Sequence, residues 1–116
     1  MNPDDFIEHA IQRGVLEGLG ALQQPEQAIF AISEAEVYCD KDGFDSLLHR
    51  YGPSSMDLFA RAFAVMGAVE IADTLQAIAS FGDSAPEELL NRANRLITQR
   101  HQYKYESIRA FVERGA

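Results

Sequence analysis

The densest group of carboxylates in this 116-residue sequence lies in residues 34–48, on either side of a single glycine. The pattern Asp-x-Asp-Gly at residues 40–43 is similar to part of a calcium-binding loop, in which oxygen ligands precede a glycine at a sharp turn. When Gly43 takes the place of that glycine, Tyr38 stands at the first ligand position and His49 at the position of the bidentate glutamate. Because both end ligands are missing, the segment predicts a solvated corner between two helices and no metal site.

Other nucleophiles and metal ligands are sparse. The sequence holds one cysteine, Cys39, and three scattered histidines, His9, His49 and His101, with no His-x-x-x-His pair and no glycine-rich phosphate loop. Zinc needs three or four such ligands together, and a cysteine nucleophile needs a base and an orienting group. We therefore predict no catalytic, cofactor-binding or metal-binding residues, and a protein that is not an enzyme. The alternative of a small ligand-binding or enzymatic helical domain, with a pocket near Tyr38, Cys39 and His49, stays open.

Acidic side chains, by contrast, recur at helical spacing. Four pairs have no base beside them: Asp4 with Glu8, Glu36 with Asp40, Asp42 with Asp45, and Glu70 with Asp73. Like charges at this spacing cost a helix a few tenths of a kcal/mol, so their clustering does not help folding. Side chains so placed lie about 5 to 6 Å apart, a spacing comparable to that of backbone phosphates, and could occupy the cationic groove of a DNA-binding protein. The candidate partner-binding residues are Glu34, Glu36, Asp40, Asp42, Asp45, Glu70 and Asp73.

The net charge of -8 is unevenly divided along the chain. Residues 1–88 hold sixteen acidic and four basic residues, whereas residues 89–116 hold two acidic and six basic residues. The acidic part would repel phosphates, so we predict no direct nucleic-acid binding; it favours a basic protein surface as partner, or solubility alone. The basic C-terminal part is similar in composition to a nucleic-acid surface. We expect it instead to be a solvated face or a patch that packs on the protein's own acidic half.

The elements that must position these groups are helices. Apolar residues recur at helical spacing along most of the chain, and we find no sustained strand alternation. Glycine, proline and capping residues delimit expected helices at about residues 3–18, from about residue 25 to between residues 38 and 41, and at about 44–51, 54–66 and 69–81, with a further one from about residue 84.

Two of these helices open with patterns typical of capping boxes, Ser54-x-x-Asp57 and Ser84-x-x-Glu87. Whether the stripe 103–112 extends the last helix or forms another one stays open. A chain of this length can bury about two thirds of its unfolded surface without a disulfide or a metal. We predict an all-α fold in which residues 1–116 form a single domain, a compact bundle of about five to seven helices with short loops.

The cysteine content and the N-terminal sequence also bear on where in the cell the protein is found. A single cysteine cannot form an intramolecular disulfide and is compatible with a reducing environment. The acidic N-terminus leads into no apolar stretch of signal-peptide or transmembrane length. We expect a cytoplasmic protein without a membrane segment.

Four features of residues 28–82 follow one another in a recognisable order: the glutamate-bearing segment 34–37, the corner 42–45 followed by two leucines, the apolar helix end 65–68, and the helix 71–82. This order resembles a small bacterial family of all-helical domains of unknown function, of which one acidic member is known as a DNA-mimic protein. The family usually has two glycines before the phenylalanine of the corner, where this chain has Asp42 and Gly43. The resemblance implies the fold, whereas the mimic role belongs to the surface charge of that one member.

Charge and resemblance together favour a non-enzymatic acidic interaction module, open to homodimer formation, that binds a basic protein surface. A DNA-binding regulator, bound in the manner of a DNA mimic, is the expected partner. An immunity or antitoxin-like protein that neutralises a basic toxin would use the same surface and stays open as an alternative.

Overall fold

Helices form nearly all the regular structure of the chain. The computed structural model describes residues 2–115, in which no strand occurs, so the all-α prediction is confirmed. Three short 3-10 helices connect some of the longer ones: η1 (Leu19–Ala21), η2 (Pro53–Ser55) and η3 (Gly82–Ser84). The seven α-helices of the described residues are α1 (Pro3–Glu17), α2 (Glu26–Lys41), α3 (Phe44–Tyr51), α4 (Met56–Val65), α5 (Val69–Phe81), α6 (Glu87–Thr98) and α7 (Tyr105–Glu113).

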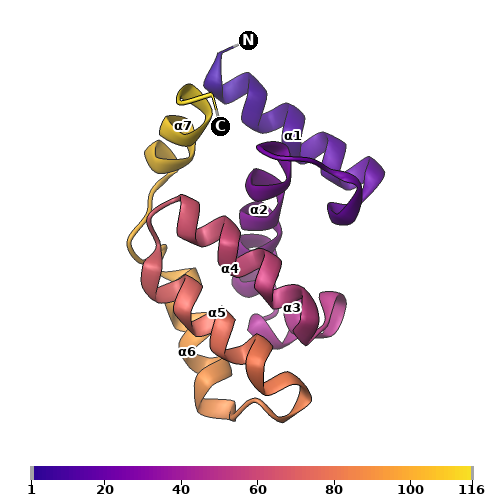
Figure 1. The fold of residues 1–116 in the computed structure, drawn as a ribbon, viewed down its shortest axis with the longest axis vertical. Coiled ribbons are helices and arrows are strands. Elements are labelled where there is room, and N and C mark those ends of the chain that lie inside the picture. The colour runs from indigo at the N-terminus through magenta and orange to yellow at the C-terminus, as the bar shows by residue number, and fades with distance from the viewer. Residues whose placement is uncertain (1, 116) are drawn as a thin grey trace.

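Helix α2 runs through the centre of the molecule and packs against α1, α3, α4 and α6 (Figure 1). Ile29, Phe30 and Ile32 on α2 are each at most 3% exposed, because neighbouring helices surround this segment. Helices α4, α5 and α6 follow as a run of neighbours, and the whole fold measures 43 × 28 × 24 Å. In the part of the chain that the structure describes, no helix is long and apolar enough to span a bilayer.

The first helix begins and ends where local chemistry requires. The Asn2 side chain accepts a hydrogen bond from the Asp5 amide at 2.9 Å, which caps the helix. Gly14 is buried against the ring of Phe30, and a Cβ at this position would overlap that ring. Gly18 ends the helix with a φ of 90°, a left-handed conformation that glycine adopts without steric cost.

Both capping boxes expected from the sequence are wrong. The Ser84 hydroxyl donates backwards to the Phe81 carbonyl oxygen at 2.9 Å, and Pro86 occupies the N-cap of α6. Helix α4 begins at Met56, directly after η2, and its N-cap residue makes no side-chain hydrogen bond. In each case a 3-10 turn precedes the helix, so the serine lies too early in the chain to serve as the cap.

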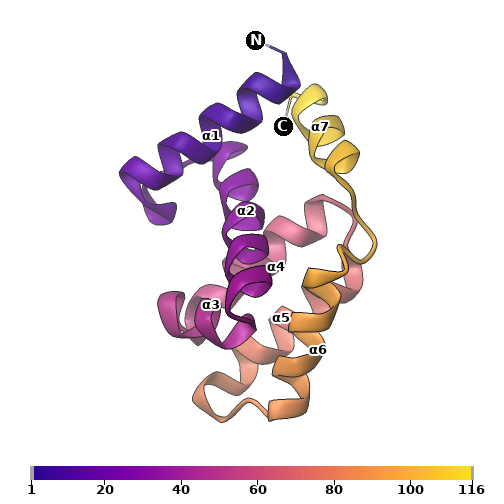
Figure 2. The same cartoon turned by 180° about the vertical axis from the view of Figure 1, so that it is seen from behind.

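The C-terminal stripe, which the sequence left undecided, forms a separate helix. A turn between α6 and α7 includes Arg100 with a φ of 53° and Gln102 with a φ of 67°, both left-handed. Helix α7 then packs against α1, beside the start of the chain (Figure 2). The Tyr105 hydroxyl donates to the Asp4 carboxylate at 2.8 Å and joins the two helices.

Candidate functional site

A hydrogen bond from helix α6 fixes the corner between α2 and α3. Gly43 has a φ of 93°, and its amide donates to the Tyr38 carbonyl oxygen at 3.0 Å as α2 ends. The amide of the next residue, Phe44, donates to Oδ1 of Asn94 on α6 at 3.0 Å, and the Phe44 ring is 2% exposed. Asp42 and Asp45 flank this fixed turn, and both are exposed. The corner therefore presents two carboxylates from a rigid backbone.

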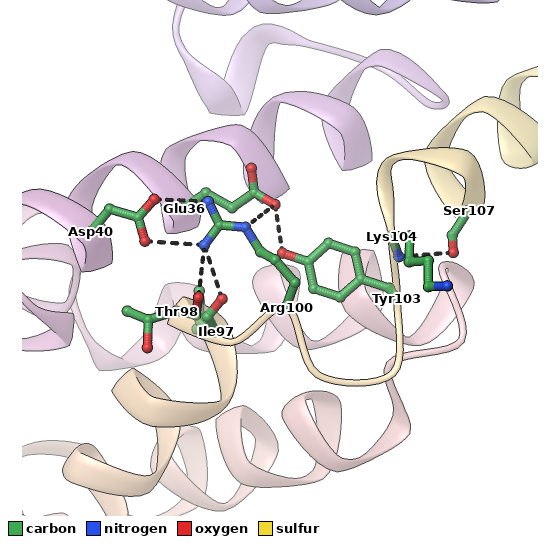
Figure 3. A network of polar contacts seen from close by, with 8 residues as sticks. All are labelled: Glu36, Asp40, Ile97, Thr98, Arg100, Tyr103, Lys104 and Ser107. Carbon is green, nitrogen blue, oxygen red and sulfur yellow. Dashed lines mark hydrogen bonds and ion pairs between the residues drawn. The ribbon is translucent and has the colours of Figure 1, made fainter.

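Along α2, Glu36 and Asp40 share one cation, Arg100 from the α6–α7 turn (Figure 3). The two terminal nitrogens of the guanidinium donate to the two oxygens of Asp40 at 3.0 and 2.7 Å, and Nε lies 3.1 Å from Glu36. Glu36 also accepts a hydrogen bond of 2.6 Å from the hydroxyl of Tyr103, whose ring is 4% exposed. One guanidinium therefore offsets one of the two negative charges of this pair, and both carboxylates are held by contacts within the chain.

His101, the residue after Arg100 in the α6–α7 turn, contacts Glu70 of α5. Nε2 of His101 lies 3.0 Å from the Glu70 carboxylate, close enough for an ion pair when protonated although not aligned as a hydrogen bond. Nη2 of Arg92 lies 3.6 Å from the same carboxylate, and the Glu70 amide donates to the Gln102 side chain at 2.9 Å. The hydrogen bond from the Glu70 amide fixes the side chain of Gln102, and His101 and Gln102 both contact Glu70 of α5. The α6–α7 turn therefore links α2, through Arg100, to α5.

The expectation that the acidic pairs lie without cations is therefore wrong for several of them. Arg100 pairs with both Glu36 and Asp40, and Arg92 lies beside Glu70. Glu34 accepts a hydrogen bond from Tyr51 at 2.5 Å. Asp4, outside the candidate set, pairs with Arg109 at 3.2 Å. Three of the six basic residues after residue 88, Arg92, Arg100 and Arg109, thus pair with acids of the first 88 residues, as one sequence interpretation expected. The other three are exposed, as the interpretation of a solvated face expected.

Four of the seven candidate residues form no ion pair among residues 2–115: Glu34, Asp42, Asp45 and Asp73. Of these, Glu34 is held by the Tyr51 hydroxyl, whereas the three aspartates have no such internal contact in the described part of the chain. Asp42 and Asp45 lie together at the α2–α3 corner, and both line a cavity of about 100 Å³ against α6. Asp73 lies on the exposed face of α5. The structure thus separates the candidates into an internally paired group and a group with free charge.

Ion pairing alters the electrostatics of the internally paired group. The Arg100 guanidinium, by hydrogen bonding and charge, holds the pKa of Asp40 below its ordinary value of 3.8. Burial, together with the hydrogen bond to the Glu36 carboxylate, raises the pKa of Tyr103. At neutral pH Asp40 is therefore ionised and Tyr103 is protonated, which are the states that these contacts require.

The Cys39 thiol is held in an unreactive state. Its side chain belongs to the hydrophobic core and is 4% exposed. Burial raises the pKa of the thiol to about 12, with a smaller contribution from the neighbouring Asp40. Because only the thiolate is nucleophilic, we expect Cys39 to react slowly at neutral pH.

The pocket expected near Tyr38, Cys39 and His49 takes a different form. His49 and Asp45 line a cavity of about 500 Å³ between α3 and η3, which Tyr38 and Cys39 do not line. Within residues 2–115 no group of three or more His, Cys, Asp or Glu side chains has an arrangement that could hold a metal ion.

Sequence reasoning did not identify the residues that cover the acidic row. Arg100, Tyr103 and Gln102 come from a turn whose position could not be derived from local pattern. The one available signal was the excess of basic residues after residue 88, opposite in sign to the rest of the chain.

Comparison with known proteins adds one finding. A family model described as DMP19-like protein matches residues 20–113 and so contains the whole segment 28–82. No curated protein and no solved structure matches the chain.

Proposed function

Because the chain belongs to the DMP19-like protein family, which includes a DNA mimic, we propose that it is a non-enzymatic interaction module with an acidic binding surface. The partner that this surface fits is a basic surface of another protein. Following the DNA-mimic member of the family, the proposed partner is a DNA-binding regulator.

The observation that carries the proposal is the free charge at the α2–α3 corner. Asp42 and Asp45 are exposed, form no ion pair within the described residues, and flank a turn that the Phe44–Asn94 hydrogen bond fixes. Charges already held in place lose little conformational entropy when a partner's lysine or arginine approaches. They also speed association with a basic surface through long-range attraction.

The spacing of the acidic pairs on α2 and α5 supports the choice of a DNA-binding partner. Glu36 and Asp40 on α2, and Glu70 and Asp73 on α5, are three or four residues apart on one helix, a spacing of about 5 to 6 Å. Asp42 and Asp45 do not share this spacing, because Asp42 ends α2 and Asp45 lies on α3, on the other side of the corner. A protein that binds DNA offers a row of lysines and arginines to a row of phosphates, and most of its affinity depends on those contacts. An acidic helical surface can occupy that row and so compete with DNA.

The internally paired carboxylates have a secondary role in this proposal. Glu36 and Asp40 already share Arg100, so a partner must compete with that guanidinium or bind the remaining lone pairs. Glu34 is likewise held by Tyr51. We therefore assign most of the binding energy to Asp42, Asp45 and Asp73, and less to Glu34, Glu36, Asp40 and Glu70.

The chemistry of Cys39 supports a binding role over an enzymatic one. The most nucleophilic side chain of the sequence is buried, with a thiol pKa of about 12, and does not line the cavity that contains His49. A small-molecule enzyme built at this place would need the thiolate exposed to its substrate.

The test is capture from a bacterial lysate at low salt with two matched variants. In the first, Asp42, Asp45 and Asp73 are changed to asparagine. In the second, three exposed acids of α1 and α7, Glu8, Glu106 and Glu113, are changed to glutamine, so that the change in net charge is the same. We expect a basic DNA-binding protein to be retained by the wild type and the second variant, released by salt, and lost from the first.

Competition then separates a mimic from an ordinary binder. Added wild-type protein should release the captured regulator from its DNA, whereas the triple asparagine variant should not. If both variants captured the regulator equally, Asp42, Asp45 and Asp73 would be excluded as its binding surface. A captured basic protein that does not bind DNA would favour the immunity or antitoxin-like alternative.

A further inference from the structure

The end of α5 exposes an aromatic ring. The sequence contains seven phenylalanines, and among them Phe81 is exceptional because 51% of its surface is exposed. Phe81 is the last residue of α5, directly before Gly82, which turns the chain with a φ of 63°. Exposed apolar side chains are common singly, but an aromatic ring at the mouth of a cavity is typical of binding surfaces.

Phe81 forms one wall of a groove of about 350 Å³ between the end of α5 and the start of α6. Pro86 and Leu89 supply its other apolar side chains, and Glu88, Arg92 and Arg95 its charged ones. The α6 residues face the same groove because they are three or four positions apart on one helix. The groove therefore combines an apolar floor with a mostly basic rim.

The charge of this rim is opposite to that of the molecule. Two guanidiniums stand against the single carboxylate of Glu88, in a chain of net charge -8. Arg92 lies 3.6 Å from Glu70 and 3.4 Å from the Thr74 hydroxyl, whereas the Arg95 side chain makes no ion pair or hydrogen bond within residues 2–115. Glu88 and Arg92 are spaced as a favourable i,i+4 pair and Arg95 lies in the last turn of α6, but Arg95 itself has no acidic side chain paired with it among the described residues.

We propose that this groove is a second docking surface, which binds an acidic segment of a partner protein that carries an apolar side chain. The apolar side chain lies between Phe81 and Leu89, and a neighbouring carboxylate pairs with the fork of Arg95. The occupant follows from charge complementarity, because an acidic segment meets cations here and would be repelled by the α2–α3 corner. The proposal is independent of the proposed function, which uses other residues and a partner of opposite charge.

The test uses fluorescence anisotropy with labelled peptides and the full chain. The probe is a peptide of sequence Ser-Glu-Glu-Phe-Leu-Glu-Ser; one control replaces its glutamates by lysines, and another replaces Phe-Leu by Gly-Gly. We expect binding of the first peptide alone, at micromolar to millimolar concentration. Phe81→Ala and Arg95→Glu should each weaken binding about tenfold, as central contacts of small interfaces do.

Matched variants outside the groove keep the result specific. Val37→Ala removes another exposed apolar side chain, and Arg114→Glu reverses another exposed arginine. Both should change the dissociation constant less than about twofold. Because Arg95 is exposed, Arg95→Glu should fold normally and keeps the test decisive even if Phe81→Ala does not fold.

Three results of the peptide measurements would overturn the proposal. They are no binding of the acidic peptide at millimolar concentration, equal binding of the lysine peptide, and unchanged binding in Arg95→Glu. Preferential binding of oligothymidylate to the groove would also overturn it, because the occupant would then be a nucleic acid.

Discussion

Arg100 binds the Asp40 carboxylate through both terminal nitrogens, at 3.0 and 2.7 Å, although the two residues are 60 positions apart in the chain. A bidentate pair of this kind fixes both distance and orientation. It ties the α6–α7 turn to α2 and places a cation over two of the acidic residues that the sequence singles out.

Replacing that cation should destabilise the fold. Arg100→Gln removes the ion pairs to Asp40 and Glu36, and we expect a loss of about 1 to 2 kcal/mol in the free energy of unfolding, since the site is partly exposed. Arg114→Gln, an exposed arginine of α7's end, should change it by less than about 0.5 kcal/mol. Urea unfolding at pH 7 measures both, and equal values would show that the Arg100 pairs contribute nothing.

The same substitution should strengthen the proposed partner's binding. Arg100→Gln removes the cation from Glu36 and Asp40, while Glu36 keeps its hydrogen bond from Tyr103, so the regulator captured by the wild type should bind this variant about threefold or more tightly. Arg114→Gln, with the same change in net charge, controls for overall electrostatic attraction. Identical dissociation constants for the two variants, from isothermal titration at 0.1 M salt, would place Glu36 and Asp40 outside the interface.

The Asp40 pair should also make stability depend on pH. Because Arg100 lowers the pKa of Asp40 in the folded protein, the stabilisation is complete above the ordinary value of 3.8 and is lost as the pH falls through the lower, folded value. The difference in unfolding free energy between the wild type and Asp40→Asn should thus be constant from pH 5 to 7 and shrink at pH 3. A difference that stays constant down to pH 3 would contradict the shift.

Cys39 should be protected from thiol reagents. With 4% exposure and a thiol pKa of about 12, we expect native protein at pH 8 to react with Ellman's reagent at least about a hundredfold more slowly than protein in 6 M guanidinium. Rapid reaction of the native protein would reopen the enzymatic alternative.

Close packing at Gly14 gives a stability test of the α1–α2 contact. Gly14→Ala improves helix propensity by about 1 kcal/mol. The new methyl group, however, would overlap the Phe30 ring, so we expect a net loss of about 1 to 3 kcal/mol. Gly20→Ala meets no atom within 4 Å and should be neutral or slightly stabilising. Thermal unfolding of the two variants, followed by circular dichroism, compares them, and a more stable Gly14→Ala would show that the helices separate readily.

Local chemistry made the helices predictable. The breaks at Gly18, Gly43 and Gly82 have φ values of 90°, 93° and 63°, conformations in which glycine is favoured because it has no Cβ. The presence of the helices, and the places where glycine interrupts them, could therefore be predicted from residues that are close together in the sequence. The capping boxes failed because a 3-10 turn and the following helix compete for the same few residues, and that competition depends on packing.

The candidate site was predictable in its residue types but not in its pairing. The sequence by itself determined an acidic helical chain with a basic C-terminal part, because charge and periodicity are local properties. Only the tertiary structure decided that Arg100 covers Glu36 and Asp40 while Asp42 and Asp45 keep their free charge. The reason is that ion pairing depends on a left-handed turn at Arg100 and on the packing of α6 against α2, neither of which is encoded within any short stretch of residues.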